Sequence, residues 1–322
     1  MKAAVYYETG PPTVFKYEDV PDPACPPDGL LINVEAISIE GGDTLNRGGG
    51  DMANKPHIVG YQCAGTIREV GPEVSERSAG ERVVAVMPFG SHAAIVAVPE
   101  NAVWPLPDGM DIQQAASIPV PFGTADDCLF EFGKLQAGET VLIQAGAGGV
   151  GLAAIQLAKR AGATVLATAS SDERLERLKE FGLDHGLNYK TGDFVAEARA
   201  LTGGRGVDLV VDSVGGKTLG GSLESLRYRG RAISVGHAGR DDTPPDLGML
   251  SAGNRTLTGV FLGAELAIQP ERVRANVASH IADVASGKLR AVIDRAFPLS
   301  DAAEAHAYIE SRQAFGRVIL IP

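Results

Sequence analysis

The sequence predicts an α/β fold, in which a Rossmann-type doubly wound parallel sheet is joined to a second, β-rich domain. Three observations lead to this prediction. The 322 residues suffice for about two domains of roughly 150 residues each. Apolar strand-like runs alternate with helical patterns through the middle of the chain, as in a parallel sheet covered by helices. A glycine-rich turn, Ala145–Gly151, separates one such strand from the helical pattern that follows it.

Residues 1–116 have the pattern of a β domain. Turn signals rich in Gly and Pro separate short runs of β-branched and apolar residues. These runs are Leu30–Ala36, Ala64–Val70, Arg82–Val86 and Ala93–Val98. Their short spacing predicts a compact, mostly antiparallel sheet.

Strands and helices alternate from residue 117 to about residue 262. The predicted strands are Thr140–Gln144, Thr164–Thr168, Val207–Asp212, Arg231–Val235 and Thr256–Phe261, and the predicted helices are Gly149–Ala161, Asp172–Phe181 and Leu219–Leu226. Two further helical patterns, 270–286 and 300–310, precede a final strand, Gly316–Ile321, which we expect to return to the first domain. The predicted division is 118–263 for the dinucleotide-binding domain, and 1–117 with 264–322 for the other.

Composition and charge limit the possible partners. The net charge of −11 argues against binding to nucleic acid or anionic membranes. The cysteines Cys25, Cys63 and Cys128 form no CxxC pair, which argues against a disulfide framework and favours a reducing compartment. The N-terminal segment lacks the apolar stretch of a signal peptide, and no apolar run reaches the roughly 20 residues that cross a bilayer. We therefore expect a cytoplasmic protein with no membrane insertion.

The turn Gly146-Ala147-Gly148-Gly149-Val150-Gly151 has the form GxGxxG between an apolar strand and an amphipathic helix, the context that this motif requires. Gly146 permits the tight turn, Gly148 lets the backbone approach a pyrophosphate, and Gly151 lets the helix pack close to the strand. The free N–H groups at the start of the helix favour an anion. The turn predicts dinucleotide binding, and a glycine-rich loop without function is the alternative.

The residues after the second strand of this domain distinguish NAD from NADP. An NAD site places a carboxylate there for the ribose 2′-hydroxyl, whereas this chain has Ser170 and Ser171, followed by Arg174. The hydroxyls can donate to a 2′-phosphate, and the guanidinium can pair with it. Asp172 and Glu173 lie where acids favour a helix N-terminus. The pattern favours NADPH; alternatively, the serines only cap the helix and Arg174 is a solvated helix residue.

With these residues in view, the chain resembles the zinc-independent quinone oxidoreductases of the medium-chain dehydrogenase/reductase superfamily over nearly its whole length. The matching segments, in order, are Gly60–Gly65, Val70-Gly71, Gly80–Val83, Ala115–Thr124, the glycine turn, Asn188-Tyr189, Asp212–Gly215 and Gly316–Leu320. The resemblance implies a GroES-like catalytic domain, a Rossmann domain and an active-site cleft between them. Because dimers are common in this family, it also implies a homodimer.

The same resemblance implies cofactor contacts outside the glycine turn. It places Thr124 near the nicotinamide, and Arg174 and Tyr189 around the 2′-phosphate. The other implied contacts are Ser213, Gly236, His237, Phe261 and Leu262, on the adenine-ribose and nicotinamide sides, together with Arg317. Several have ordinary alternatives: Tyr189 as a half-buried tyrosine, His237 as a loop histidine, and Phe261 as a core residue.

Zinc-dependent relatives hold a catalytic ion with a Cys, a His and often a Glu from a Gly-His-Glu run. At that run this chain reads Gly60-Tyr61-Gln62, and the stretch 39–43 supplies no thiol, so we expect no metal. The candidate catalytic residues are Tyr61, Gln62 and Asp43. Tyr61 stands where the ligand histidine would be and is a candidate proton donor or quinone-stacking residue, or else a tyrosine that only lines the cleft.

The family's substrate-orienting pattern NxxDTY is only half present. Asp43 and Thr44 match it, whereas Glu40 replaces the Asn and Leu45 replaces the Tyr. Asp43 has a structural alternative, in which it holds the loop by hydrogen bonds.

Without a metal, the predicted reaction is hydride transfer from NADPH to a quinone or a related activated carbonyl, whose developing charge is delocalised and whose proton water can supply. One alternative is an NADPH-dependent enone or enoyl-thioester reductase. The other is an NADPH-binding sensor with little catalysis, which the departures at Glu40 and Leu45 keep open.

Overall fold

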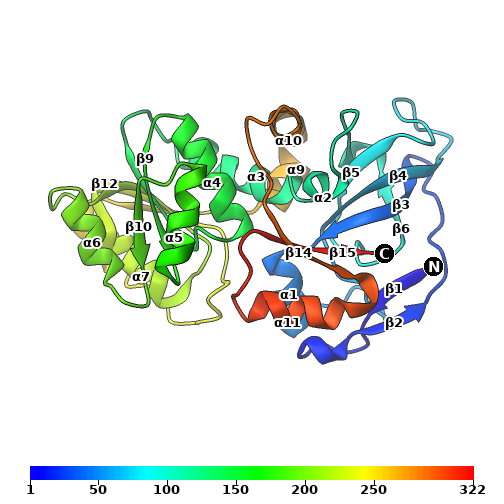
Figure 1. Ribbon diagram of the computed structural model, residues 1–322, viewed down its shortest axis with the longest axis horizontal. Helices are drawn as coiled ribbons and strands as arrows, with labels where there is room; N and C mark the ends of the chain where they lie inside the picture. Colours follow the sequence, from blue (N-terminus) through cyan, green and yellow to red (C-terminus); the bar gives the residue numbers. More distant parts are fainter. The chain divides into compact units, whose positions relative to one another are not determined.

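Residues from both ends of the chain share one unit of the fold. In the computed structural model of residues 1–322, Met1–Val120 and Glu271–Pro322 form the first unit and Pro121–Pro270 the second (Figure 1). The sequence predicts the limits at 117/118 and 263/264, whereas the structure divides the chain at 120/121 and 270/271. The α/β class is confirmed, because one unit contains a parallel sheet and the other a largely antiparallel one.

The first unit is built on a seven-stranded sheet with the order β14-β15-β3-β4-β5-β7, in which β6 also pairs with β3. The strands are β3 (Gly29–Ser38), β4 (Gln62–Val70), β5 (Arg82–Val86), β6 (Ile95–Pro99), β7 (Val103–Pro105), β14 (Ile293–Pro298) and β15 (Arg317–Ile321). All pairs are antiparallel except β14 with β15. Because β15 pairs with β3, the C-terminal strand returns to the first unit as predicted.

The remaining elements of the first unit surround this sheet. They are the antiparallel pair β1 (Lys2–Val5) and β2 (Lys16–Asp19), the helices α1 (Gly41–Gly49), α2 (Ile112–Ala116), α10 (Pro270–Ala285) and α11 (Ala302–Glu310), and the short 3-10 turns η1 (Pro12–Val14), η2 (Glu100–Ala102) and η5 (Leu299–Asp301). Buried side chains such as Ile32 and Ile37 of β3 pack with Leu320 of β15 in a common core. Burial of apolar surface of this kind is the main stabilising contribution to a fold.

Helix α1 forms although four of its nine residues are glycines, which the sequence patterns did not predict. At its start, the Glu40 N–H donates to the Asp43 carboxylate over 2.7 Å, which caps the helix. At its other end, the fully buried Arg47 donates to the Gly10 carbonyl and pairs with Glu310 of α11, which lies beside α1 (Figure 1). Tertiary contacts thus compensate for the low helix propensity of glycine.

The second unit contains the predicted parallel sheet, with the order β10-β9-β8-β11-β12-β13. Its strands are β8 (Thr140–Ile143), β9 (Thr164–Ala169), β10 (His185–Asn188), β11 (Val207–Asp212), β12 (Leu226–Ser234) and β13 (Thr256–Gly259). The strand order reverses between β8 and β11. In doubly wound sheets, ligands bind outside the carboxyl ends of the strands at such a point.

Helices cover both faces of this sheet (Figure 1). The helices that pack on it are α4 (Gly149–Arg160), α5 (Asp172–Leu178), α6 (Phe194–Leu201), α7 (Gly216–Ser225) and α8 (Gly248–Gly253). The unit also contains α3 (Pro119–Asp126), the π-helical turn η3 (Asp127–Glu131), the 3-10 turn η4 (Lys179–Phe181) and α9 (Leu262–Ile268). Helices α4 and α5 pack on β8, β9 and β10, whereas α7 and α8 pack on β11 and β12. None of the helices combines the length and the apolar character needed to cross a bilayer.

Candidate active site

The glycine turn lies between β8 and α4, directly at the point where the strand order reverses. The Gly146 N–H donates to the Thr168 carbonyl over 2.8 Å, and the Gly148 N–H donates to the Ala145 carbonyl over 2.9 Å. A Cβ at Gly151 would lie 2.4 Å from the Ala145 oxygen, so the fold itself requires glycine there. The sequence predicts close packing of Gly151 on the strand, whereas the close contacts of Gly151 are with the turn residues Ala145 and Gly146 that follow β8.

Gly148 is different, because nothing in the chain excludes a side chain at this position. The nearest atom to a Cβ built there is the Ala145 oxygen at 3.4 Å, an ordinary contact. The space next to Gly148 is therefore free for a ligand. Gly149 and Val150 begin α4, whose first N–H groups have no partner within the helix. Open space beside a helix N-terminus fits the pyrophosphate of a dinucleotide.

The residues expected around a 2′-phosphate meet at the carboxyl ends of β9 and β10. Ser170 and Ser171 follow β9, and the Ser171 hydroxyl accepts a hydrogen bond of 3.4 Å from the Arg174 N–H, which makes Ser171 the N-cap of α5. The Tyr189 N–H donates to the Ala169 carbonyl over 3.2 Å, so the residue after β10 lies beside Ser170. The fold thus brings together the two serines, Arg174 and Tyr189.

Lys190 is a further cation at the carboxyl ends of β9 and β10, and the sequence patterns did not single it out. Its Nζ lies 5.7 Å from the centre of the Tyr189 ring. The neighbouring Asn188 amide donates to the Asp172 carboxylate over 2.7 Å, which gives that acid a partner within the protein. The signal in the sequence was the position of Lys190, directly after the Asn188-Tyr189 segment.

The other expected cofactor residues lie in the loops that follow β11 and β12, and in α3. The Ala238 N–H donates to the Ser213 carbonyl over 3.0 Å, which joins these two loops and brings Ser213 close to Gly236 and His237. Thr124 is buried in α3. Phe261 is 73% exposed, so its alternative as a core residue is wrong, whereas Leu262 at the start of α9 is buried.

In the first unit, Tyr61 has a defined environment. Its hydroxyl accepts a hydrogen bond of 2.7 Å from the Asn46 amide, and its ring packs on Gly42, where a Cβ would lie 2.6 Å from the Tyr61 Cε2. Burial, together with the nearby Asp43 and Glu40 carboxyl groups, raises the pKa of Tyr61 above its ordinary value. The hydroxyl therefore keeps its hydrogen, and as an acceptor from Asn46 it can donate that hydrogen to a ligand.

Gln62 and Arg317 meet on the carboxyl group of Glu40. Gln62 Nε2 and the Arg317 guanidinium both donate to Glu40, and Arg317 Nε also donates to Ser38 Oγ over 2.9 Å. The Gln62 Oε1 accepts from the Val120 N–H over 3.0 Å, so both ends of this amide are occupied. Burial raises the pKa of Glu40 to about 7, while Arg317 and Gln62 act in the opposite direction. Arg317, expected near the cofactor, thus donates into a buried polar cluster of its own unit.

These residues do not form a zinc-ligand set. No group of three His, Cys, Asp or Glu side chains is placed to hold a metal ion. Cys63 lies in the apolar core, where burial raises the pKa of its thiol to about 12, far from the thiolate form that binds zinc. Asp43 is fully buried, which raises the pKa of its carboxyl well above its ordinary value, and one of its oxygens caps α1.

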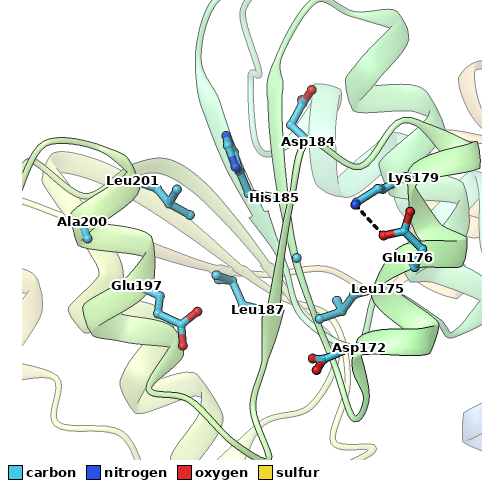
Figure 2. A pocket seen from close by; sticks show the side chains of 11 residues that line it. Asp172, Leu175, Glu176, Lys179, Asp184, His185, Leu187, Glu197, Ala200 and Leu201 are labelled. Atoms are coloured by element: carbon cyan, nitrogen blue, oxygen red, sulfur yellow. Dashed lines mark hydrogen bonds and ion pairs between the residues drawn. The ribbon is translucent and has the colours of Figure 1, made fainter.

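A groove of about 570 Å³ lies elsewhere in the second unit, along the edge strand β10 (Figure 2). Figure 2 shows Asp172 and Leu175 of α5 on one side of β10, and Glu197 and Leu201 of α6 on the other. None of the residues that line it belongs to the glycine turn or to the expected cofactor contacts. Its size therefore does not identify it as the active site.

Comparison with known proteins now identifies the family. Residues 26–108 match the family model of the alcohol dehydrogenase GroES-like domain, and residues 149–294 match that of the zinc-binding dehydrogenase. A quinone oxidoreductase of Pseudomonas aeruginosa is 33% identical over 317 residues, which are 97% of each chain. The chain belongs to the medium-chain dehydrogenase/reductase superfamily. Among the members of that superfamily it is quinone oxidoreductase-like, as the sequence motifs predicted.

Two further relatives of this medium-chain oxidoreductase bear on its chemistry. A 2-haloacrylate reductase from a Burkholderia species is 33% identical over 331 residues, covering 99% of this chain and 98% of the relative. The crystal structure of Escherichia coli quinone oxidoreductase in complex with NADPH superposes with a TM-score of 0.95 at 29% identity, covering all of both chains. The GroES-like and Rossmann parts predicted from the sequence are thereby confirmed.

Proposed function

We propose that this medium-chain oxidoreductase uses NADPH to reduce a quinone or a related activated carbonyl, without zinc. One observation carries the proposal. The dinucleotide turn has open space at Gly148. In the same unit, Ser170, Ser171 and Arg174 follow β9, where an NAD site would have a carboxylate. The Escherichia coli relative solved with NADPH supports the choice of cofactor.

When bound, the nicotinamide supplies the hydride. The chain's own residues bind and orient it: the turn and the start of α4 hold the pyrophosphate, and Arg174 with Tyr189 and Lys190 binds the 2′-phosphate. Tyr61 donates the hydrogen of its hydroxyl to the oxygen of the acceptor as charge develops there. A quinone delocalises that charge over its ring, so one hydrogen-bond donor is enough to stabilise it.

The residues at the positions of the zinc ligands support a reaction without zinc. Tyr61 and Gln62 stand at the ligand positions of the zinc-dependent relatives, and both Gln62 amide atoms already have partners within the protein. Glu40, the nearby carboxyl group, is paired with Arg317. A Lewis acid would have to displace these buried bonds.

A second candidate function is the reduction of a carbon–carbon double bond conjugated to a carbonyl or carboxyl group. The Burkholderia relative is named as the reductase of such a compound, a 2-haloacrylate. The same hydride donor and the same hydroxyl would serve this reaction.

The proposed function is tested by mixing the protein with NADPH and following the loss of nicotinamide absorbance on adding simple quinones and 2-haloacrylates, with and without a metal chelator. We expect oxidation by a quinone that the chelator leaves unchanged. Turnover of haloacrylates alone would establish the second candidate. NADPH binding without oxidation by any acceptor would indicate the NADPH-binding sensor. A protein that does not bind NADPH would refute the quinone reductase, the reductase of conjugated double bonds and the sensor alike.

Replacement of Tyr61 by phenylalanine is expected to lower kcat with quinones about tenfold, the effect of losing one hydrogen bond of ~1.4 kcal/mol in the transition state. The dissociation constant of NADPH should not change. The matched control is Tyr308→Phe on α11, which removes a hydroxyl that donates to Asp294 of β14 over 2.7 Å and should leave kcat unchanged. Equal kinetics of Tyr61→Phe and the parent protein would remove Tyr61 from the mechanism.

We also propose that the protein is a homodimer. Strand β13 ends the sheet of the second unit, so one of its edges is open. Two exposed apolar side chains belong to neighbouring elements: Tyr228, 62% exposed, is on β12, which pairs with β13, and Leu247, 57% exposed, precedes α8, the helix before β13 in the chain. Sedimentation of the Leu247→Asp variant, compared with Leu201→Asp on α6, which packs on β10 at the other end of the sheet, tests whether this edge is the dimer contact.

The cytoplasm is the proposed location. Cys25, Cys63 and Cys128 are all free thiols, and the last two are buried. Free thiols are typical of reducing compartments.

A further inference from the structure

A line of buried polar side chains runs beneath the dinucleotide turn. The Ala145 N–H donates to Thr168 Oγ1 over 3.1 Å, and the Thr168 hydroxyl donates to Gln144 Oε1 over 2.7 Å. Gln144 Nε2 then donates to Ser222 Oγ over 3.0 Å, and the Ser222 hydroxyl donates to Asp212 Oδ2 over 2.7 Å. We call Thr168, Gln144, Ser222 and Asp212 the polar chain. Its members are at most 2% exposed, and they come from β9, the end of β8, α7 and β11.

The hydrogen bonds of the polar chain all run in one direction. Each hydroxyl accepts one hydrogen bond and donates one, and the Gln144 amide accepts through its oxygen and donates through its nitrogen. The chain ends on Asp212, whose other oxygen accepts from the Val214 and Gly215 N–H groups, each over 2.8 Å. Such a satisfied network is rigid, because turning any one member around leaves a buried group without a partner.

At its other end, the polar chain fixes the residue that shapes the turn. Ala145 has a φ of +53°, a left-handed conformation that is uncommon for a residue with a side chain. Its carbonyl accepts from the Gly148 N–H and lies against Gly151. Thr168 accepts hydrogen bonds from two successive N–H groups of the turn. The Thr168 hydroxyl accepts from the Ala145 N–H, and the Thr168 carbonyl accepts from the Gly146 N–H. The orientation of the Ala145 peptide therefore depends on the Thr168 hydroxyl.

We propose that the polar chain positions the pyrophosphate turn, and that Thr168 is a positioning residue for cofactor binding. None of its members needs to touch the ligand. The inference rests on the proposed function, since it assumes that the turn binds the pyrophosphate. If the proposal is right, disturbing the polar chain lowers the affinity for NADPH and NADH alike, because both contain the pyrophosphate. The affinity for a nucleotide without a 5′-phosphate should not change.

The test compares Thr168→Val, which has the same shape without the hydroxyl, with Thr168→Ser, which keeps it. Fluorescence titration of Thr168→Val should show NADPH and NADH both bound about tenfold more weakly, the value of one hydrogen bond. Adenosine 2′-monophosphate should bind as to the parent protein. Thr168→Ser should restore the affinity for both dinucleotides to within about twofold.

Thr202→Val is the matched control. The Thr202 hydroxyl is also buried in the second unit, accepts from the Gly206 N–H over 3.0 Å and donates to the Ala198 carbonyl over 2.9 Å, but it lies at the end of α6. This variant should lose a similar amount of thermal stability and keep the affinity for NADPH. If Thr168→Val does not fold, Ser222→Ala tests the polar chain at a residue two hydrogen bonds further from Ala145. This variant should weaken the binding of NADPH and NADH alike.

Three results would overturn the inference: unchanged dinucleotide affinity in Thr168→Val or Ser222→Ala, an equal loss of adenosine 2′-monophosphate affinity, or an equal loss of NADPH affinity in Thr202→Val. Failure of the assumed dinucleotide binding is distinguishable from these results, because the parent protein would then bind neither NADPH nor NADH, whereas a parent protein that binds NADPH without oxidising it would contradict the proposed reduction and leave this inference testable.

Discussion

Replacing Arg317 by methionine is expected to lower the free energy of unfolding by about 3–5 kcal/mol. The guanidinium is buried against the Glu40 carboxyl group and also donates to Ser38 Oγ and the Ile39 carbonyl. Methionine fills much of the same volume but leaves Glu40 without its compensating charge. Urea unfolding of the variant and the parent protein measures the difference.

A matched ion pair on the surface of the same unit provides the control. Arg68 pairs with Asp22 over 3.1 Å, and both side chains are nearly half exposed. Arg68→Met should therefore change stability by no more than about 1 kcal/mol. In the double variant Arg317→Met, Glu40→Gln, no charge is left unpaired, and much of the stability should return. An effect of Arg317→Met no larger than that of Arg68→Met would contradict the prediction.

The cost of Arg317→Met should also depend on pH. Burial raises the pKa of Glu40 from 4.5 to about 7, and Arg317 holds it below the value that burial alone would give. Removing Arg317 raises the folded-state pKa further above the unfolded one. Between these two values the folded state binds more protons, so its stability falls as the pH rises. The variant should lose more stability relative to the parent at about pH 8 than at about pH 5.

Arg174→Glu is expected to weaken the binding of NADPH about 100-fold and that of NADH by no more than about threefold. Loss of a charge-assisted hydrogen bond accounts for roughly 2–3 kcal/mol, and the new carboxylate repels the 2′-phosphate. Fluorescence titration with both cofactors measures the ratio. Arg177→Glu, the same reversal on an exposed residue of α5, should leave the ratio unchanged. Equal losses of both cofactors in Arg174→Glu would mean that this residue does not contact the 2′-phosphate.

Strands that consist of β-branched runs between turn residues were predictable from the sequence. Two of them, Arg82–Val86 and Val207–Asp212, match β5 and β11 residue for residue. Their hydrophobic pattern and the breaking residues on either side carry all the information needed. The glycine turn was predictable for a similar reason, because the strand, turn and helix that define it are contiguous in the sequence.

Elements that depend on distant contacts were not predictable. Helix α1 is rich in glycine, and it is held by a cap at Asp43 and by the contact of Arg47 with Glu310, which lies 263 residues further along the chain. The edge strand β10 is short and polar, and only its pairing with β9 defines it. The polar chain beneath the turn likewise joins side chains up to 78 residues apart. Glu40 departs from the family pattern in the sequence, and its structural partner Arg317 lies 277 residues further along the chain.

The pairing of β15 with β3 has a consequence for biosynthesis. The second unit is continuous in sequence, so all of its strands are available once residues 121–270 have been made. The first unit stays incomplete at that time, because β3 lacks β15 and Glu40 lacks Arg317. Domains generally fold as units, and contacts that close long loops form slowly. The nucleotide-binding half can thus mature on the ribosome before the amino-terminal half, although the latter begins to emerge first.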